Sequence, residues 1–288
     1  MKQPHYFALV GRNIEYSRSP EIFDAIYRHL RQQGRFEVLS MEAKELPSRV
    51  RQAVLDGCRG FSVTIPFKHE VVQYLDDIDP VALAINAVNS IAVEGGRLLG
   101  YNTDCYGFSK PLKQHRLLIK GGRAMILGCG GAARAAIYAL RRDFDIKQFI
   151  IVARSPEKAE GLREVFDNGE PSPDITVKAA PLKRGSLPDQ LNIVVNCTPV
   201  GGWRSPKESP LPDGFDFSRL KVYYDMNYNE GNRTVAEARK AGIKAFDGAS
   251  MLVSQAVRSF DIWTGQSVEF EPIFEAVFGP GRTSAAQS

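Results

Sequence analysis

The stretch that decides the fold is Ala124-Met125-Ile126-Leu127-Gly128-Cys129-Gly130-Gly131-Ala132-Ala133. Its four apolar residues predict a buried strand, and residues 135–140 continue beyond the glycines as a helix. Glycines at such a turn let the backbone approach a pyrophosphate, whose charge is met by free amides and the helix dipole. We therefore predict a dinucleotide site at Gly128, Gly130, Gly131, Ala132 and Ala133.

The strand expected at residues 149–153 ends in Ala153-Arg154-Ser155. An acidic residue at this place would accept a hydrogen bond from a ribose 2′-hydroxyl, whereas a guanidinium and a hydroxyl suit a 2′-phosphate. Arg154 and Ser155 thus favour NADP over NAD as the cofactor. Glu157 leaves some use of NAD open, and the alternative for Arg154 is a solvated surface side chain.

Short apolar runs alternate with helical patterns along the whole chain, which indicates an α/β fold with mostly parallel sheets. The strands expected in the two halves lie at 7–11, 36–41, 60–65, 124–127, 149–153, 193–196 and 222–226. With 288 residues, the chain has room for two domains of about 100 to 200 residues each. We expect 1–105 plus 245–288 to form one domain and 106–244 to form a Rossmann-type domain.

Glycine, proline and capping residues indicate where single helices and strands begin and end. Ser19 and Pro20 predict the N-cap and first turn of a helix over 21–30, and Pro66 ends the strand that begins at Gly60. Residues 87–99 alternate around Gly95-Gly96, which predicts a hairpin at an edge of the first sheet. Apolar residues at helical spacing predict a long helix over 251–263.

The composition excludes several classes of protein. Apolar residues make up 43% and charged residues 24%, as in a globular protein, and the net charge of +4 is not gathered into a basic stripe, so nucleic acid is not an expected partner. No apolar run approaches ~18 residues, and the four cysteines form no metal-binding pattern. We expect a cytoplasmic protein without membrane insertion or metal, as a monomer or homodimer.

Polar residues recur at the expected ends of elements in the first half of the chain. They are Ser17-Arg18-Ser19-Pro20, Thr64 and Lys68, Asn86-Ala87-Val88-Asn89-Ser90, and Gly100-Tyr101-Asn102-Thr103-Asp104. An open α/β sheet places its ligand crevice at the carboxyl ends of its strands. Any one of these loops would be read as turn chemistry, but together they predict a binding site.

These motifs, taken in order, resemble the shikimate dehydrogenase family over nearly the whole chain. The resemblance also rests on Val63-Thr64-Ile65-Pro66-Phe67-Lys68, the glycine turn, Asn196-Cys197-Thr198-Pro199-Val200-Gly201, Asp225-Met226-Asn227-Tyr228-Asn229 and Met251-Leu252-Val253-Ser254-Gln255-Ala256. It implies NADP-dependent reduction of 3-dehydroshikimate to shikimate, in chorismate and aromatic amino acid biosynthesis. It also implies that residues 106–244 bind the cofactor and that the other domain binds the substrate.

The resemblance assigns roles to individual residues. Lys68 and Asp104 would act as a catalytic pair, in which a proton reaches the forming alkoxide as hydride arrives from the nicotinamide. The substrate carboxylate would be held by Ser17, Ser19 and Tyr228, and the ring hydroxyls by Thr64, Asn89, Asp104 and Gln255. The nicotinamide side of the cleft would be lined by Asn196, Thr198, Pro199, Val200 and Gly201, with Met251 near the ring. Met226 and Gly248 would also bind the cofactor.

The match is incomplete at three places. Ser62 stands where the family commonly has asparagine, Ala153 where it has asparagine, and Ser250 where it has glycine. The alternatives left open are a quinate/shikimate or aminoshikimate dehydrogenase, a different two-domain dehydrogenase, and a sensor that binds ligand without catalysis. A sensor would not need both Lys68 and Asp104, so the sequence favours an enzyme.

Overall fold

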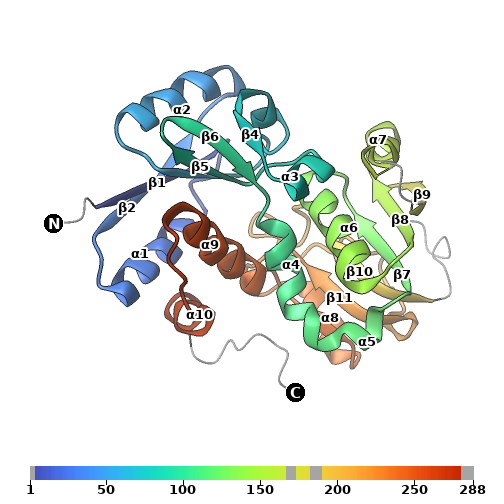
Figure 1. Cartoon of the computed structure of the whole chain (residues 1–288). Coiled ribbons are helices and arrows are strands. Elements are labelled where there is room, and N and C mark those ends of the chain that lie inside the picture. The colour runs from blue at the N-terminus through green and yellow to red at the C-terminus, as the bar shows by residue number, and fades with distance from the viewer. Residues whose placement is uncertain (1–3, 167–172, 182–189, 280–288) are drawn as a thin grey trace. The chain divides into compact units, whose positions relative to one another are not determined.

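The computed structural model describes residues 4–166, 173–181 and 190–279. These residues fold into two compact units. Unit 1 joins the chain up to Gly107 to the part from Leu252 onward, and unit 2 runs from Phe108 to Met251. Each unit holds one six-stranded sheet, which confirms the predicted α/β class (Figure 1).

The sheet of unit 1 has the strand order β2-β1-β3-β5-β6-β4. Strands β2, β1 and β3 run parallel, β5 and β6 form an antiparallel hairpin, and β4 pairs in parallel with β6. The bounds are β1 (His5–Gly11), β2 (Gly34–Ser40), β3 (Gly60–Val63), β4 (Asp77–Ile78), β5 (Ser90–Glu94) and β6 (Arg97–Tyr101). The hairpin expected at the sheet edge is therefore one strand inside it, because the two-residue β4, too short to show any alternation, covers β6.

Helices cover both faces of this sheet, which is why its strands read as continuous apolar runs. The unit contains α1 (Ser19–Leu30), η1 (Ala43–Glu45), α2 (Leu46–Leu55), η2 (Glu70–Tyr74), α3 (Pro80–Ile85) and α10 (Phe270–Phe278), and the helices α4 (Asp104–Leu112) and α9 (Ala249–Thr264) include its residues as well. Val10 and Phe61 pack with Val50 of α2 on one face. On the other face, Phe7 contacts Phe23 of α1 at 6.1 Å and Trp263 of α9 at 4.7 Å between ring centroids.

The first helix begins one residue earlier than the sequence indicates. Arg18, not Ser19, is the N-cap of α1, and its side chain makes no capping hydrogen bond. The Ser17 hydroxyl instead accepts a hydrogen bond from the backbone amide of Ser19 at 3.2 Å. The expected cap at Ser19 is thus wrong by one position, because the backbone amide of Ile22, which a cap at Ser19 would take, donates to the Arg18 carbonyl at 3.2 Å.

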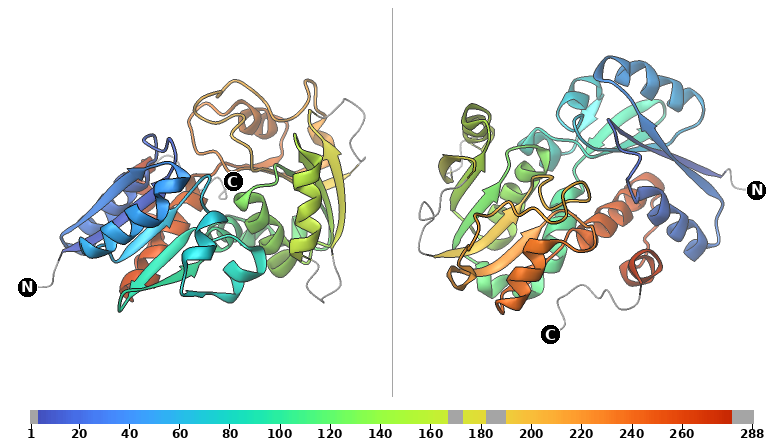
Figure 2. Two further views of the ribbon diagram at one scale, coloured as in Figure 1. Left: turned by 90° about the horizontal axis from the view of Figure 1, so that it is seen from above. Right: turned by 180° about the vertical axis from the view of Figure 1, so that it is seen from behind.

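The sheet of unit 2 is parallel throughout, with the order β12-β11-β10-β7-β8-β9. Figure 2 shows the ribbon of this unit from two further sides. Its strands are β7 (Arg123–Leu127), β8 (Gln148–Ala153), β9 (Asp174–Ala179), β10 (Leu191–Asn196), β11 (Leu220–Asp225) and β12 (Lys244–Phe246), and its helices are η3 (Lys113–His115), α5 (Arg116–Ile119), α6 (Gly131–Phe144), α7 (Pro156–Phe166), η4 (Phe217–Arg219) and α8 (Arg233–Lys240). The chain reverses direction across the sheet between β7 and β10. Doubly wound sheets bind dinucleotides at this switch point.

Both faces of this second sheet are also covered. Val235 of α8 packs with Leu127 and Val194 on one face, and Phe108 of α4 lies 4.8 Å from the ring of Tyr224 on the other.

The domain boundary expected after residue 244 would cut β12, which pairs with β11. Strands β9 and β12 were not predicted from the sequence, and residues 280–288 of the expected first domain lie outside the described part of the chain. No helix among the described residues is long and apolar enough to cross a membrane.

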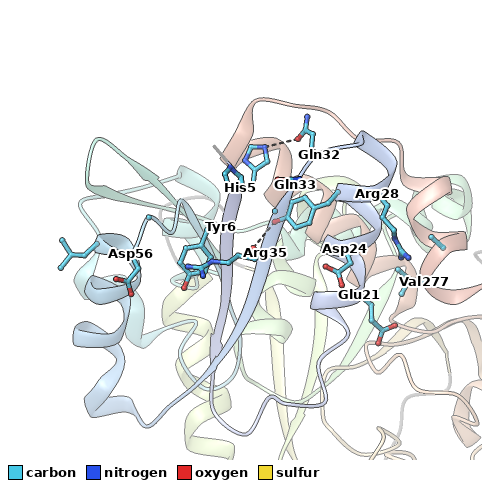
Figure 3. A pocket seen from close by; sticks show the side chains of 16 residues that line it. His5, Tyr6, Glu21, Asp24, Arg28, Gln32, Gln33, Arg35, Asp56 and Val277 are labelled. Atoms are coloured by element: carbon cyan, nitrogen blue, oxygen red, sulfur yellow. Dashed lines mark hydrogen bonds between the residues drawn. The ribbon is translucent and has the colours of Figure 1, made fainter. Parts of the chain in front are cut away.

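A large hollow in unit 1 lies at the wrong end of the sheet for a ligand crevice. It is a groove of about 1090 Å³ lined by residues at the start of β1 and β2, before β3, and in α1 and α10, including His5, Arg35 and Asp24 (Figure 3). Ligands of open α/β sheets bind beyond the carboxyl ends of the strands. We therefore place the candidate site at the opposite ends of β1 and β3.

Gly60 offers a test of how tightly α9 packs on this sheet. A Cβ at Gly60 would lie 2.4 Å from the Trp263 ring, so we expect Gly60→Ala to destabilise unit 1 by about 1–3 kcal/mol. Urea unfolding of a Trp203→Phe background, in which Trp263 is the single remaining tryptophan of two, reports this unit directly. Leu83→Ala, at a position 63% exposed, is the control and should change stability by less than about 0.5 kcal/mol. Equal stability of the Gly60→Ala protein would contradict the packing.

Candidate active site and dinucleotide site

The polar centre of unit 1 is an ion pair at the end of β3. The Lys68 ammonium lies 2.6 Å from Oδ2 of Asp104, the first residue of α4, with side-chain exposures of 17% and 6%. The backbone carbonyl of Lys68 accepts a hydrogen bond from the amide of Val88 at 2.7 Å, and Phe67 beside it is buried. Lys68 is therefore held on a fixed backbone, and its side chain is not solvent-exposed as that of a single lysine after a strand usually is.

Asn89 ties this ion pair to the rest of the unit. Its side-chain amide donates to Asp104 Oδ1 and Thr103 Oγ1, both at 3.0 Å, and reaches Gln255 Oε1 of α9 at 3.4 Å. Its carbonyl oxygen accepts the backbone amide of Thr103 at 2.7 Å. Asp104 thus has one oxygen facing the ammonium and one facing Asn89, which fixes the orientation of the carboxylate.

The structure brings together four of the residues predicted for this site, Lys68, Asp104, Asn89 and Gln255. Sequence reasoning missed Ser259, whose hydroxyl lies 3.1 Å from Thr103 Oγ1 and so extends the network along α9. A signal was present, because Ser259 follows Gln255 by four residues and residues at that spacing share a helix face.

The predicted carboxylate site begins at the first turn of α1. The Ser17 hydroxyl donates to the Ser19 hydroxyl at 3.1 Å, and Ser19 is buried whereas Ser17 is half-buried. Two adjacent hydroxyls at a helix N-terminus suit an anion. Thr64, which follows β3, is half-buried. Tyr228 belongs to unit 2, and its part in this site stays a prediction.

In unit 2 the glycine turn leaves β7 at the switch point, as expected. Gly128 has φ +107°, and a Cβ there would lie 3.3 Å from the carbonyl oxygen of Cys197, so the turn needs glycine. Gly130 is the N-cap of α6 and offers no side chain to cap the helix amides. A Cβ at Gly130 would meet nothing within 4 Å. The turn therefore leaves open space at a helix N-terminus, and these residues fit a pyrophosphate.

The residues predicted to select the 2′-phosphate follow β8. Arg154 is exposed, while the Ser155 hydroxyl donates to Glu157 at 3.0 Å. The pKa of Glu157 is lowered by its own backbone amide first and by Ser155 second. The sequence analysis missed two further cations, Lys158 and Arg134, which lie close enough to Cys129 to favour its thiolate, although burial still raises the pKa of that thiol. The turn is thus set in positive surroundings.

The loops after β10 and β11 carry the other predicted cofactor residues. Thr198 donates its hydroxyl to Asn196 Oδ1 at 2.7 Å, and its backbone carbonyl accepts from Asn227 at 3.0 Å, so Thr198, Pro199 and Val200 form one braced segment. Gly248 lies against the next loop, and a Cβ there would lie 2.1 Å from the carbonyl oxygen of Met226. Met251 is buried in the first turns of α9.

Two family patterns match parts of this chain. The family pattern for the shikimate dehydrogenase substrate binding domain matches residues 9–91, and the pattern for the shikimate 5′-dehydrogenase C-terminal domain matches residues 248–278. Shikimate dehydrogenase (NADP(+)) of Pelodictyon phaeoclathratiforme is 36% identical over 281 residues, covering 96% of this chain and 97% of that protein.

Solved structures share the whole fold. Shikimate 5-dehydrogenase of Thermus thermophilus, determined in complex with NADP(H) and shikimate, superposes with a TM-score of 0.79 at 31% identity, covering 95% of this chain and 98% of that one. The ligand-free 5-ketofructose reductase of Gluconobacter sp. strain CHM43 superposes with a TM-score of 0.81 at 28% identity, covering 96% and 99%. The fold alone is therefore compatible with more than one carbonyl substrate.

Cys129 reports ligand binding at the glycine turn. It is half-buried, whereas Cys58 is buried and its thiol pKa is raised to about 12. We expect a maleimide to label Cys129 in the folded protein, faster at higher pH because the thiolate reacts, and Cys58 to stay unlabelled. A dinucleotide at the turn should slow labelling of Cys129, as read by peptide mass spectrometry. Labelling that is unchanged by saturating NADP would place the cofactor elsewhere.

Proposed function

The chain belongs to the shikimate dehydrogenase family, and we propose on that premise that Lys68 and Asp104 carry the reversible NADP-dependent reduction of 3-dehydroshikimate to shikimate. The observation that supports it best is the 2.6 Å ion pair between Lys68 and Asp104, which lies after β3. Both side chains are largely buried, and Asn89 fixes the carboxylate. An ammonium held at a strand end next to a buried carboxylate is placed to exchange a proton with a substrate oxygen.

The roles of the side chains follow from their contacts. Lys68 gives a proton to the carbonyl oxygen during reduction and takes it back during oxidation. Asp104 holds the ammonium through Oδ2 and stabilises its charge, and Asn89 holds Asp104 through Oδ1. When bound, NADPH supplies the hydride that the protein itself lacks.

The remaining residues of the site bind and orient the substrate. Asn89 and Gln255, with Thr64, present amides and a hydroxyl, which suit the hydroxyl groups of a neutral ring face. Ser17 and Ser19 at the start of α1 are suited to a carboxylate, and we assign Tyr228 to the same group. The cofactor's pyrophosphate lies at Gly128 to Ala133 in this proposal, and its 2′-phosphate at Arg154 and Ser155.

The proposal also covers the nicotinamide contacts, the role of each domain and the location in the cell. We assign Thr198, Pro199, Val200, Met226, Gly248 and Met251 to the nicotinamide side, and residues up to Gly107 with those from Leu252 to the substrate domain. A cytoplasmic location is supported by the four cysteines, which form no disulfide, as reducing compartments maintain. Quinate and aminoshikimate remain the competing substrates, and Ser62 is the departure that bears on them.

Variants of the pair test the mechanism. We expect Lys68→Ala to lower kcat for shikimate oxidation by about 10²–10⁴-fold with shikimate binding largely retained, because the proton acceptor is lost. Lys68→Arg keeps the charge but holds its proton, and it should be equally impaired. Lys44→Ala, an exposed lysine of the same unit, should match wild type. Absorbance of the reduced nicotinamide with shikimate, quinate and 5-ketofructose measures all of these, and full activity of Lys68→Arg would sink the proton-transfer role.

Arg154 tests the choice of cofactor. If its guanidinium binds the 2′-phosphate, Arg154→Ala should raise KM for NADP by about 10- to 100-fold and leave KM for NAD nearly unchanged. Arg97→Ala, on the exposed hairpin of unit 1, serves as the charge-matched control. A parallel rise in both KM values would instead indicate that Arg154 supports the fold of the turn.

A further inference from the structure

A buried carboxylate stands at the centre of the polar network of unit 2. Asp225 ends β11 directly opposite Asn196, the last residue of β10, and is fully buried. Its Oδ2 accepts hydrogen bonds from Asn196 Nδ2 at 3.0 Å and the Tyr223 hydroxyl at 2.9 Å. Its Oδ1 accepts from the backbone amide and side-chain Nδ2 of Asn227 at 2.9 and 2.8 Å. Four donors thus converge on one side chain.

This arrangement favours the ionised form of Asp225. A protonated carboxyl needs an acceptor, and the three nitrogen groups around it can only donate, which leaves the Tyr223 hydroxyl as the one neighbour of the four that could accept. Burial raises the pKa of Asp225, and the hydrogen bonds from Asn196 and Asn227 oppose that rise. Within the described residues, no lysine, arginine or histidine forms an ion pair with it. The negative charge is therefore met by dipoles and not by a cation.

The donors to Asp225 also hold the segment 197–201. Asn196 donates its second amide hydrogen to the carbonyl of Val200 at 2.8 Å. Asn227 reaches the carbonyls of Thr198 at 3.0 Å and Val200 at 3.2 Å. Because both asparagines are oriented by the carboxylate, the backbone of this segment depends on a side chain that is itself out of reach of any ligand.

We propose that Asp225 is a positioning residue for the nicotinamide half of the cofactor, and that its buried negative charge favours the cationic oxidised nicotinamide over the neutral reduced one. This rests on the proposed function, which assigns Thr198, Pro199 and Val200 to the nicotinamide. Asp225 would position the nicotinamide half through the segment 197–201 that its donors hold. It would favour the oxidised cofactor because water screens its negative charge poorly inside the protein.

The test compares three ligands on the full-length Asp225→Asn variant. Adenosine 2′,5′-bisphosphate lacks the nicotinamide, so its affinity should stay within about twofold of wild type. Asparagine cannot accept from four donors, so we expect NADP⁺ to bind about tenfold or more weakly, the loss expected for hydrogen bonds to a charged group. NADPH should lose less than NADP⁺. Titration calorimetry reads all three affinities without turnover.

Two further variants keep the test decisive. Tyr223→Phe removes one donor and keeps the charge of Asp225, so it should weaken NADP⁺ and NADPH alike, on a smaller scale, and leave the bisphosphate unchanged. This variant tests the positioning role even if Asp225→Asn fails to fold. Ser109→Ala breaks a part-buried hydrogen bond to Asp143 elsewhere in unit 2 and should change none of the three affinities.

The outcomes separate this proposal from the proposed function. Unchanged NADP⁺ affinity in both variants, or a loss of the bisphosphate in parallel with NADP⁺, would overturn the positioning role. Equal losses of NADP⁺ and NADPH in Asp225→Asn would overturn the charge preference. If wild type binds the nucleotides but turns over no shikimate, the proposed function fails while the binding pattern still decides the role of Asp225.

Discussion

In a sheet covered by helices on both faces, polar groups reach a ligand at the ends of the strands. Both units of this protein obey that constraint. In unit 1, Lys68 lies in the turn after β3 and Asn89 just before β5, and in unit 2 the glycine turn follows β7 while Asn196 ends the adjacent β10. The chemistry is concentrated at these edges because hydrogen bonding within the sheets satisfies the backbone elsewhere.

Sequence pattern predicted most of this architecture. Apolar runs bounded by glycine and proline located β1, β7, β8, β10 and β11, since buried strands have a strong and local signature. The pattern failed for β4, β9 and β12, which are short or half-exposed and acquire strand structure from their partners. The predicted start of α1 was one residue late, because the Ile22 amide that a cap at Ser19 would take bonds to the Arg18 carbonyl instead.

The two polar networks were predictable to different degrees. Lys68, Asp104, Asn89 and Gln255 could be grouped only through their resemblance to a family, because they are up to 187 positions apart, from 68 to 255. The role of Asp225 was not visible in the sequence, because it depends on the register that sets Asp225 opposite Asn196. Ser62 is the least explained residue. It faces Ser90 across β3 and β5, and both buried hydroxyls lack a hydrogen-bond partner.

The crowding at Gly248 has a meaning for how the protein can be redesigned. A single methyl group there would lie 2.1 Å from a backbone carbonyl, and a backbone atom cannot swing aside as a flexible side chain can. Position 248 therefore accepts glycine alone, whereas an exposed position such as Leu83 tolerates many residue types. A mutant library aimed at the cofactor loops should therefore randomise the flanking positions and keep this glycine unchanged.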